Sequence, residues 1–139
     1  MTARGRTVSL SVALALCSTA AAHADSLHCG GSTIEMQGCL QAKIDEANAR
    51  LAKYLATAQA RIDKDFGSRP DLKAAQAAWV RYRELECGDL YQFWAQGTYR
   101  VLASAQCELR LTRQRTHEVW RAYLTYMDST PPLLPEPRP

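Results

Sequence analysis

Residues 76–87 of this 139-residue chain are Gln76-Ala77-Ala78-Trp79-Val80-Arg81-Tyr82-Arg83-Glu84-Leu85-Glu86-Cys87. On a helix, Trp79, Arg83 and Cys87 share one side because they recur at intervals of four, and Tyr82 lies beside them. An arginine in such a position packs its stem along the rings and pairs its head with a carboxylate such as Glu86 or with a facing carbonyl. We therefore expect a helix whose Trp79, Tyr82 and Arg83 belong to the core.

Apolar residues on both sides of this segment follow the same helical spacing of three and four positions. The first line is Leu40, Ile44, Ala47, Leu51, Leu55, Ala58 and Ile62, within a stretch that has no Gly or Pro from Cys39 to Phe66. The second is Leu72, Ala75, Trp79 and Tyr82. The third is Leu102, Ala105, Leu109, Thr112, Thr116, Val119, Tyr123 and Tyr126. No useful stretch alternates with a period of two, so we predict an all-α fold, a small bundle of three main antiparallel helices.

Capping and turn residues predict where the first two helices begin. Ser32 or Thr33 is a suitable N-cap for the first helix, and Glu35 is favourable near its positive end. Residues 66–70 are typical of a turn between helices. Pro70 fits the first turn of the second helix, where its missing N–H costs nothing.

The remainder of the chain contains a connection, a third helix and a tail. Residues 89–96 allow a short additional helix, and the third main helix is expected to begin between residues 97 and 101. The tail, residues 129–139, holds five of the six prolines. Such a segment buries little, so we expect it to be disordered or extended.

The N-terminus has the pattern of a cleavable export signal. Arg4 and Arg6 precede an apolar run, residues 8–16, that is too short to span a membrane, and Ala22-His23-Ala24 suits a signal peptidase. We predict a signal peptide over 1–24, a helical domain over 25–128 and a periplasmic or secreted location. Lipidation at Cys17 is the alternative, but the preceding Leu16 is large for a lipoprotein signal.

Loss of the signal changes the charge of the chain. Without Arg4 and Arg6, fifteen Lys and Arg stand against fourteen Asp and Glu, so the net charge falls from +3 to +1. A nucleic-acid partner would need a strongly basic domain. No second hydrophobic stretch is long enough to cross a bilayer. The sequence therefore favours neither a nucleic-acid ligand nor a transmembrane segment in the mature chain.

Four cysteines remain after the signal, Cys29, Cys39, Cys87 and Cys107. In an oxidising compartment they are most simply two disulfides at one end of the bundle. The sequence leaves three pairings open, and short connections favour Cys29–Cys39 with Cys87–Cys107. Zinc bound by these thiols and His28 is the alternative, but the C-x-x-C spacing is missing. No metal or other cofactor is expected.

An ordered set of residues resembles the LprI-type lysozyme-inhibitor domain family over about residues 29–120. The set is the early cysteine, Met36-x-x-Cys39, Leu51, Tyr54, Ala58, Leu72-Lys73-x-Ala75-Gln76-x-x-Trp79-x-x-Tyr82-Arg83-x-x-x-Cys87, Gly97-Thr98, Cys107 and Thr112-x-x-Arg115. Two departures are the aromatic residues within 88–96 and the missing lipoprotein signal. The resemblance implies a small helical envelope protein and, for at least some members, inhibition of lysozyme. It also marks Gln76, Thr112 and Arg115 as structural residues.

A second group of aromatic residues follows residues 76–87, in the connection between two helix ends. It consists of Tyr91, Phe93, Trp94 and Tyr99, with Asp89 beside them. Since Cys87 and Cys107 can fix both ends of this connection, it could present aromatics to a partner. The competing interpretation is that these rings cover the end of the core. We take the group as the candidate partner-binding site.

With this resemblance we expect a binding protein that occludes c-type lysozyme or another muramidase, rather than an enzyme. No serine has the context of a nucleophile, and only two histidines follow the signal. A periplasmic helical chaperone or stress adaptor is the alternative from another class. A third alternative is an immunity protein against a secreted cell-wall hydrolase.

Overall fold

The structure is a computed structural model that describes residues 29–67 and 69–138. The predicted signal peptide, its cleavage site near Ala24, Cys17 and His28 lie outside these residues, so the statements about them stay predictions. Within the described residues the chain forms three long α-helices and a short π-helical turn. The all-α prediction is therefore confirmed. Both disulfides form in the favoured pairing, Cys29–Cys39 and Cys87–Cys107.

Helix α1 (Thr33–Phe66) begins and ends at strong local signals. The Ser32 hydroxyl accepts a hydrogen bond from the Glu35 amide at 3.3 Å, and the Glu35 carboxylate accepts one from the Ser32 amide at 2.8 Å. This reciprocal capping box satisfies two amides that the helix cannot pair internally. The hydrogen bonds from Ser32 lower the pKa of Glu35. Gly67 ends the helix with φ of +64°, a conformation that favours glycine.

Helix α2 (Leu72–Phe93) differs from the prediction at both ends. Asp71 is its N-cap and accepts a hydrogen bond from the Lys73 amide at 2.9 Å. Pro70 therefore precedes the cap instead of occupying the first turn. At the other end the helix continues through Gly88, since one internal glycine costs only about 1 kcal/mol. No separate short helix forms at residues 89–96.

Helix α3 (Tyr99–Val119) begins inside the predicted range and continues into the π-helical turn η1 (Trp120–Leu124). Arg61 of α1 closes this end. Its Nη1 donates to the carbonyls of Tyr123 at 2.8 Å and Thr125 at 2.9 Å. A cationic side chain thus satisfies carbonyls at the negative end of the helix.

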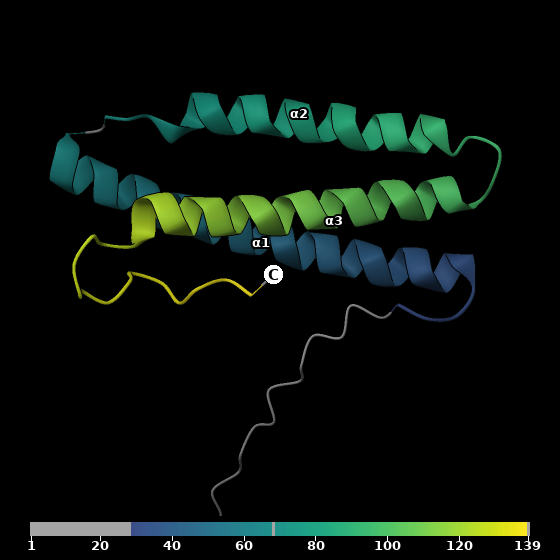
Figure 1. Cartoon of the computed structure of the whole chain (residues 1–139), viewed down its shortest axis with the longest axis horizontal. Coiled ribbons are helices and arrows are strands. Elements are labelled where there is room, and N and C mark those ends of the chain that lie inside the picture. Colours follow the sequence, from purple (N-terminus) through teal and green to yellow (C-terminus); the bar gives the residue numbers. More distant parts are fainter. Residues whose placement is uncertain (1–28, 68, 139) are drawn as a thin grey trace, which may run out of the picture.

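Successive helices run in opposite directions, so α1 and α3 are parallel to each other, and α3 lies between α1 and α2 (Figure 1). The buried face of α1 matches the predicted apolar line except at Leu55, which is only partly buried; its buried residues are Leu40, Ile44, Ala47, Leu51, Tyr54, Ala58 and Ile62. The buried residues of α3 are Leu102, Ala103, Cys107, Leu109, Leu111, Thr112, Thr116 and Val119. Because α3 has a neighbour on each side, it buries more positions than a single line.

The predicted apolar line of α2 is wrong in part. Leu72 is buried and Trp79 is partly buried, but Ala75 is exposed and Tyr82 is 49 % exposed. The reason is that α2 packs mainly against one helix, so it buries a narrow line that passes through Trp79 and Cys87. Tyr82 therefore does not belong to the core.

The C-terminal segment, residues 129–138, is extended and packs against the helices. The Leu133 amide donates to the Leu124 carbonyl, and Trp120 Nε1 donates to the Leu134 carbonyl, both at 2.9 Å. The Tyr54 hydroxyl donates to the Pro135 carbonyl at 2.6 Å. Prolines keep the backbone extended and leave its carbonyls free to accept these bonds. The alternative of a disordered tail therefore does not describe residues 129–138.

Candidate partner-binding surface

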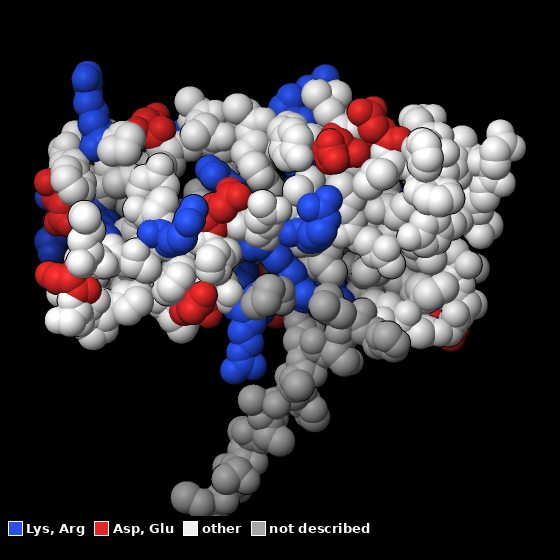
Figure 2. Space-filling model, viewed as in Figure 1, with Lys and Arg blue, Asp and Glu red and all other residues white. Residues whose placement is uncertain are grey.

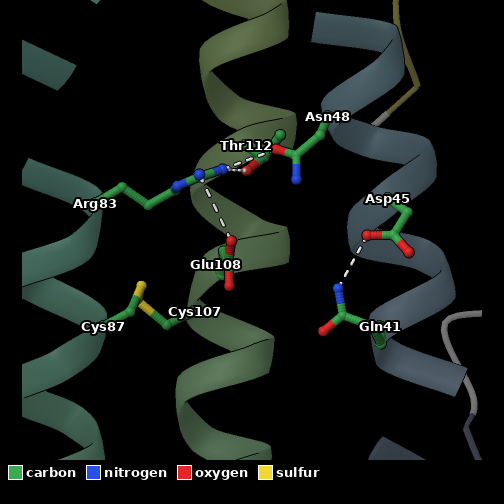
Figure 3. Close-up of polar contacts among 8 residues, drawn as sticks. All are labelled: Gln41, Asp45, Asn48, Arg83, Cys87, Cys107, Glu108 and Thr112. Carbon is green, nitrogen blue, oxygen red and sulfur yellow. Dashed lines mark hydrogen bonds and ion pairs between the residues drawn. A yellow bond between two sulfur atoms is a disulfide. The ribbon is translucent and has the colours of Figure 1, made fainter. Parts of the chain in front are cut away.

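Arg83 is the centre of a polar network that joins all three helices (Figure 3). Its Nη1 donates to Thr112 Oγ1 of α3 at 2.7 Å and to Asn48 Oδ1 of α1 at 2.9 Å. Its Nη2 lies 3.6 Å from a carboxylate oxygen of Glu108, and its guanidinium lies 5.0 Å from the ring centroid of Trp79. The network is the arrangement expected for an arginine in the core.

A second arginine repeats this arrangement between α3 and α2. Arg115 Nε donates to Gln76 Oε1 at 3.3 Å, and its Nη1 lies 3.6 Å from Glu118. For Arg83, the helical spacing suggested Glu86 as the carboxylate partner. The carboxylate beside Arg83 is instead that of Glu108 on α3, across the helix interface. Both arginines face inward, so these motif residues hold the helices together and are not available to a partner.

Tyr82 and Leu85 lie on the opposite, outward side of α2. Their exposed fractions are 49 % and 51 %. Positions 82, 86, 89 and 93 are separated by four, three and four residues, so they follow one side of the helix. We call this side of α2 the acidic–aromatic surface. It consists of Tyr82, Leu85, Glu86, Asp89, Phe93 and the adjacent Trp94. The sequence had assigned Tyr82 to the core and had not singled out Leu85.

The aromatic residues of the α2–α3 connection contact one another and remain accessible. The rings of Phe93 and Trp94 meet edge to face with centroids 5.2 Å apart, and those of Trp94 and Tyr99 do so at 5.1 Å. Phe93 is 77 % exposed, and Trp94 and Tyr99 are also exposed. Tyr91 turns to the other side of α2, where the Arg100 guanidinium lies 4.8 Å from its ring centroid.

The connection is fixed at both ends. Cys87 and Cys107 are buried and joined by a disulfide that ties the last turns of α2 to α3. The Trp94 amide donates to the Leu90 carbonyl at 3.1 Å, and the Gly97 amide donates to the Trp94 carbonyl at 3.2 Å. A surface held in this way loses little conformational entropy when it binds a partner.

The acidic–aromatic surface carries a local negative charge. Three arginines near it contact other groups. Arg83 faces inward, Arg100 lies on the ring of Tyr91, and Nη1 of Arg81 is 3.8 Å from a carboxylate oxygen of Glu84. Among the described residues no ion pair involves Glu86 or Asp89. Figure 2 shows acidic side chains over the second half of α2 and a mostly uncharged end of the molecule beside them. The surface therefore suits a partner that is basic around an apolar site.

Within residues 29–67 and 69–138 we find no group of three His, Cys, Asp or Glu side chains placed to hold a metal ion. Nor is any helix of this part of the chain long and apolar enough to cross a membrane. His117 of α3 contacts Glu136 of the C-terminal segment, with Nε2 3.0 Å from the carboxylate oxygen. The zinc alternative for the cysteines is excluded for the four that form disulfides.

Comparison with known proteins identifies the family. A family model described as "Lysozyme inhibitor LprI" matches residues 24–119, which is most of the chain. The chain belongs to the LprI lysozyme-inhibitor family, and the resemblance seen in its sequence is confirmed. No curated protein and no solved structure matches it. The family is one of inhibitor domains, and it points to a protein partner such as lysozyme.

Proposed function

We propose that this protein is an exported inhibitor that binds a lysozyme-like muramidase and occludes its substrate cleft. The observation that carries the proposal is the acidic–aromatic surface, which places exposed Phe93 and Trp94 beside Glu86 and Asp89 on a helix end fixed by a disulfide. Family membership supports the kind of partner. Occlusion requires no chemistry from this chain, only a surface that excludes the polysaccharide from the cleft.

The physical properties of this surface fit such a partner. C-type lysozymes are basic, so Glu86 and Asp89 of this surface would attract them and raise the association rate. The exposed aromatic residues Phe93 and Trp94 would supply most of the binding energy, as aromatic residues do in many interfaces. Tyr82 and Leu85 extend the apolar contact along α2.

An oxidising location is part of the proposal. Both disulfides are formed, and such bonds persist in the periplasm and outside the cell. The predicted signal peptide over residues 1–24 would bring the chain there. Mass spectrometry of the exported protein would check cleavage after Ala24.

The deciding experiment is a titration of the oxidised, exported protein against c-type lysozyme, with binding and cell-wall lysis measured together. We expect submicromolar binding and a matching loss of lysis. The double substitution Phe93→Ala/Trp94→Ala should weaken binding about thirtyfold or more, because truncation of central aromatic residues commonly costs 2 kcal/mol or more. Helicity and thermal stability should change little, since both side chains are exposed.

A matched control removes two exposed apolar side chains elsewhere. Ile34→Ala/Phe66→Ala changes residues at the two ends of α1 and should leave lysozyme affinity unchanged. Equal affinity of the Phe93→Ala/Trp94→Ala variant and the wild type would refute the acidic–aromatic surface as the binding site. Failure of the wild type to bind, with both disulfides intact, would favour another envelope hydrolase or a chaperone role.

A further inference from the structure

A large groove lies on the side of α3 that faces away from α2. It has a volume of about 1060 Å³ and is bounded by the start of α1, by α3 and by the C-terminal segment. This volume is at the upper end of the range for small-molecule sites. Pro137, which is buried, and Glu136 form the wall that the C-terminal segment contributes.

The lining of the groove changes from apolar to cationic along α3. The apolar part contains Met36 and Leu40 of α1 with Leu102 and Leu109 of α3. The cationic part contains Arg110, Arg113, His117 and Arg121 of α3 with Arg138 of the C-terminal segment. From Leu102 to Arg121 the helix rises roughly 28 Å, at about 1.5 Å per residue. The groove is therefore elongated, with an apolar half and a positive half.

The positive charge of the second half is only partly neutralised. Its two acidic residues face other groups, Glu118 towards Arg115 and Glu136 towards His117. Within the part of the chain that the structure describes, Arg110, Arg121 and Arg138 make no side-chain hydrogen bond or ion pair. Figure 2 shows Lys and Arg side chains gathered in the middle of this face, near the end of the C-terminal segment.

We propose that this groove binds an anionic single-chain amphiphile, with the acyl chain along Met36, Leu102 and Leu109 and the acidic head in the positive half, where Arg110 and Arg121 lie. The segregated lining carries the argument: an apolar chain packs on the apolar half, where Met36 is partly exposed, and a carboxylate or phosphate head needs unpaired guanidinium groups. A basic protein would be repelled by the same arginines. The groove is thus a second site, independent of the acidic–aromatic surface and of lysozyme inhibition.

The test is isothermal titration of the oxidised, exported protein with dodecanoate and with dodecyl phosphate, below their critical micelle concentrations. We expect saturable binding at one site of at least one of them, and much weaker binding of dodecanol and of dodecyltrimethylammonium. Arg110→Gln/Arg121→Gln should weaken binding of the anion at least about tenfold, because hydrogen bonds to charged groups are the stronger ones. Gln106→Trp, at an exposed position that lines the groove, should block the chain and also weaken binding.

The matched control is Lys53→Gln/Arg69→Gln, which removes the same charge from two exposed positions outside the groove. This variant should bind both anions like the wild type. The proposal is overturned if neither anion binds, if dodecanol or the cationic amphiphile binds equally well, or if the control variant loses as much affinity as Arg110→Gln/Arg121→Gln. Preference for an acidic peptide over both amphiphiles would also overturn it. Lysozyme inhibition should be unaffected by all of these variants, so the two proposals fail separately.

Discussion

Arg83 shows how one residue couples the three helices. Its guanidinium reaches acceptors on α1 and α3 from a position on α2, and its side chain is only 14 % exposed. Thr112, its closest acceptor, is completely buried. A charge in such a place is tolerated because hydrogen bonds and a nearby carboxylate satisfy it.

Substitution of Arg83 by Ala should lower the free energy of unfolding by about 2 kcal/mol, since it leaves buried Thr112 and half-buried Asn48 without their donor. Urea denaturation with both disulfides intact measures this change. The control is Arg81→Ala, which removes an exposed arginine from the same helix. It should change the free energy of unfolding by less than about 0.5 kcal/mol. Equal effects of the two substitutions would show that the network contributes nothing to stability.

The inward position of Arg83 was predictable from the sequence, whereas the outward position of Tyr82 was not. The spacing of Trp79, Arg83 and Cys87 places them on one side of a helix whatever its neighbours are. The burial of Tyr82 depends on how many helices pack against α2, and no local pattern contains that information. The same missing information hid Leu85 from the candidate site.

At the scale of the elements, the C-terminal segment behaves as part of the fold. It has no helix or strand of its own, but its carbonyls accept hydrogen bonds from Tyr54 and Trp120, and Leu134 packs against the core cluster around Leu51 and Leu124. Such contacts depend on side chains far away in the sequence. Composition alone therefore predicted the extended backbone but not the packing.

Deletion of residues 132–139 should lower the free energy of unfolding by about 2 kcal/mol, because four polar contacts and the packing of Leu134 are lost. Thermal denaturation followed by circular dichroism measures the change, and tryptophan emission should shift to longer wavelength as Trp120 becomes more exposed. Pro131→Ala/Pro132→Ala, at two exposed positions of the same segment, is the control. A deletion variant as stable as this control would show that the segment does not stabilise the helices.

Helix boundaries were predicted best where a capping residue acts locally. Ser32 and Gly67 fix the two ends of α1 with their own side chain and backbone conformation. The short additional helix allowed at residues 89–96 does not form, because α2 continues through Gly88 to Phe93 beside the Cys87–Cys107 disulfide. No pattern in the sequence predicted the π-helical turn at Trp120–Leu124.

At the scale of the whole molecule, a net charge of only +3 conceals a separation of charge. Acidic residues gather on the outward side of α2, and arginines gather along the groove beside α3 (Figure 2). A basic partner would therefore approach in one orientation, with the acidic–aromatic surface in front.

Glu86→Gln/Asp89→Asn should slow association with c-type lysozyme about fivefold at low salt, with a smaller effect on dissociation, because exposed charges act mainly on the encounter. Stopped-flow fluorescence over a series of salt concentrations measures this. The rate for the wild type should fall with salt and approach that of the variant. The control Glu46→Gln/Asp63→Asn removes the same charge from α1, and its association rate should depend on salt as that of the wild type does. If this control also lost the salt dependence, the acidic residues of α2 would not be what steers association.

The two disulfides join cysteines that are consecutive along the chain. A polypeptide that enters an oxidising compartment N-terminus first delivers Cys29 and Cys39 before either of the other two thiols. Joining each thiol to the next one to arrive gives the native pairs, so no crossed pair has to be exchanged later. Maturation of this protein should therefore need an oxidase but no disulfide isomerase.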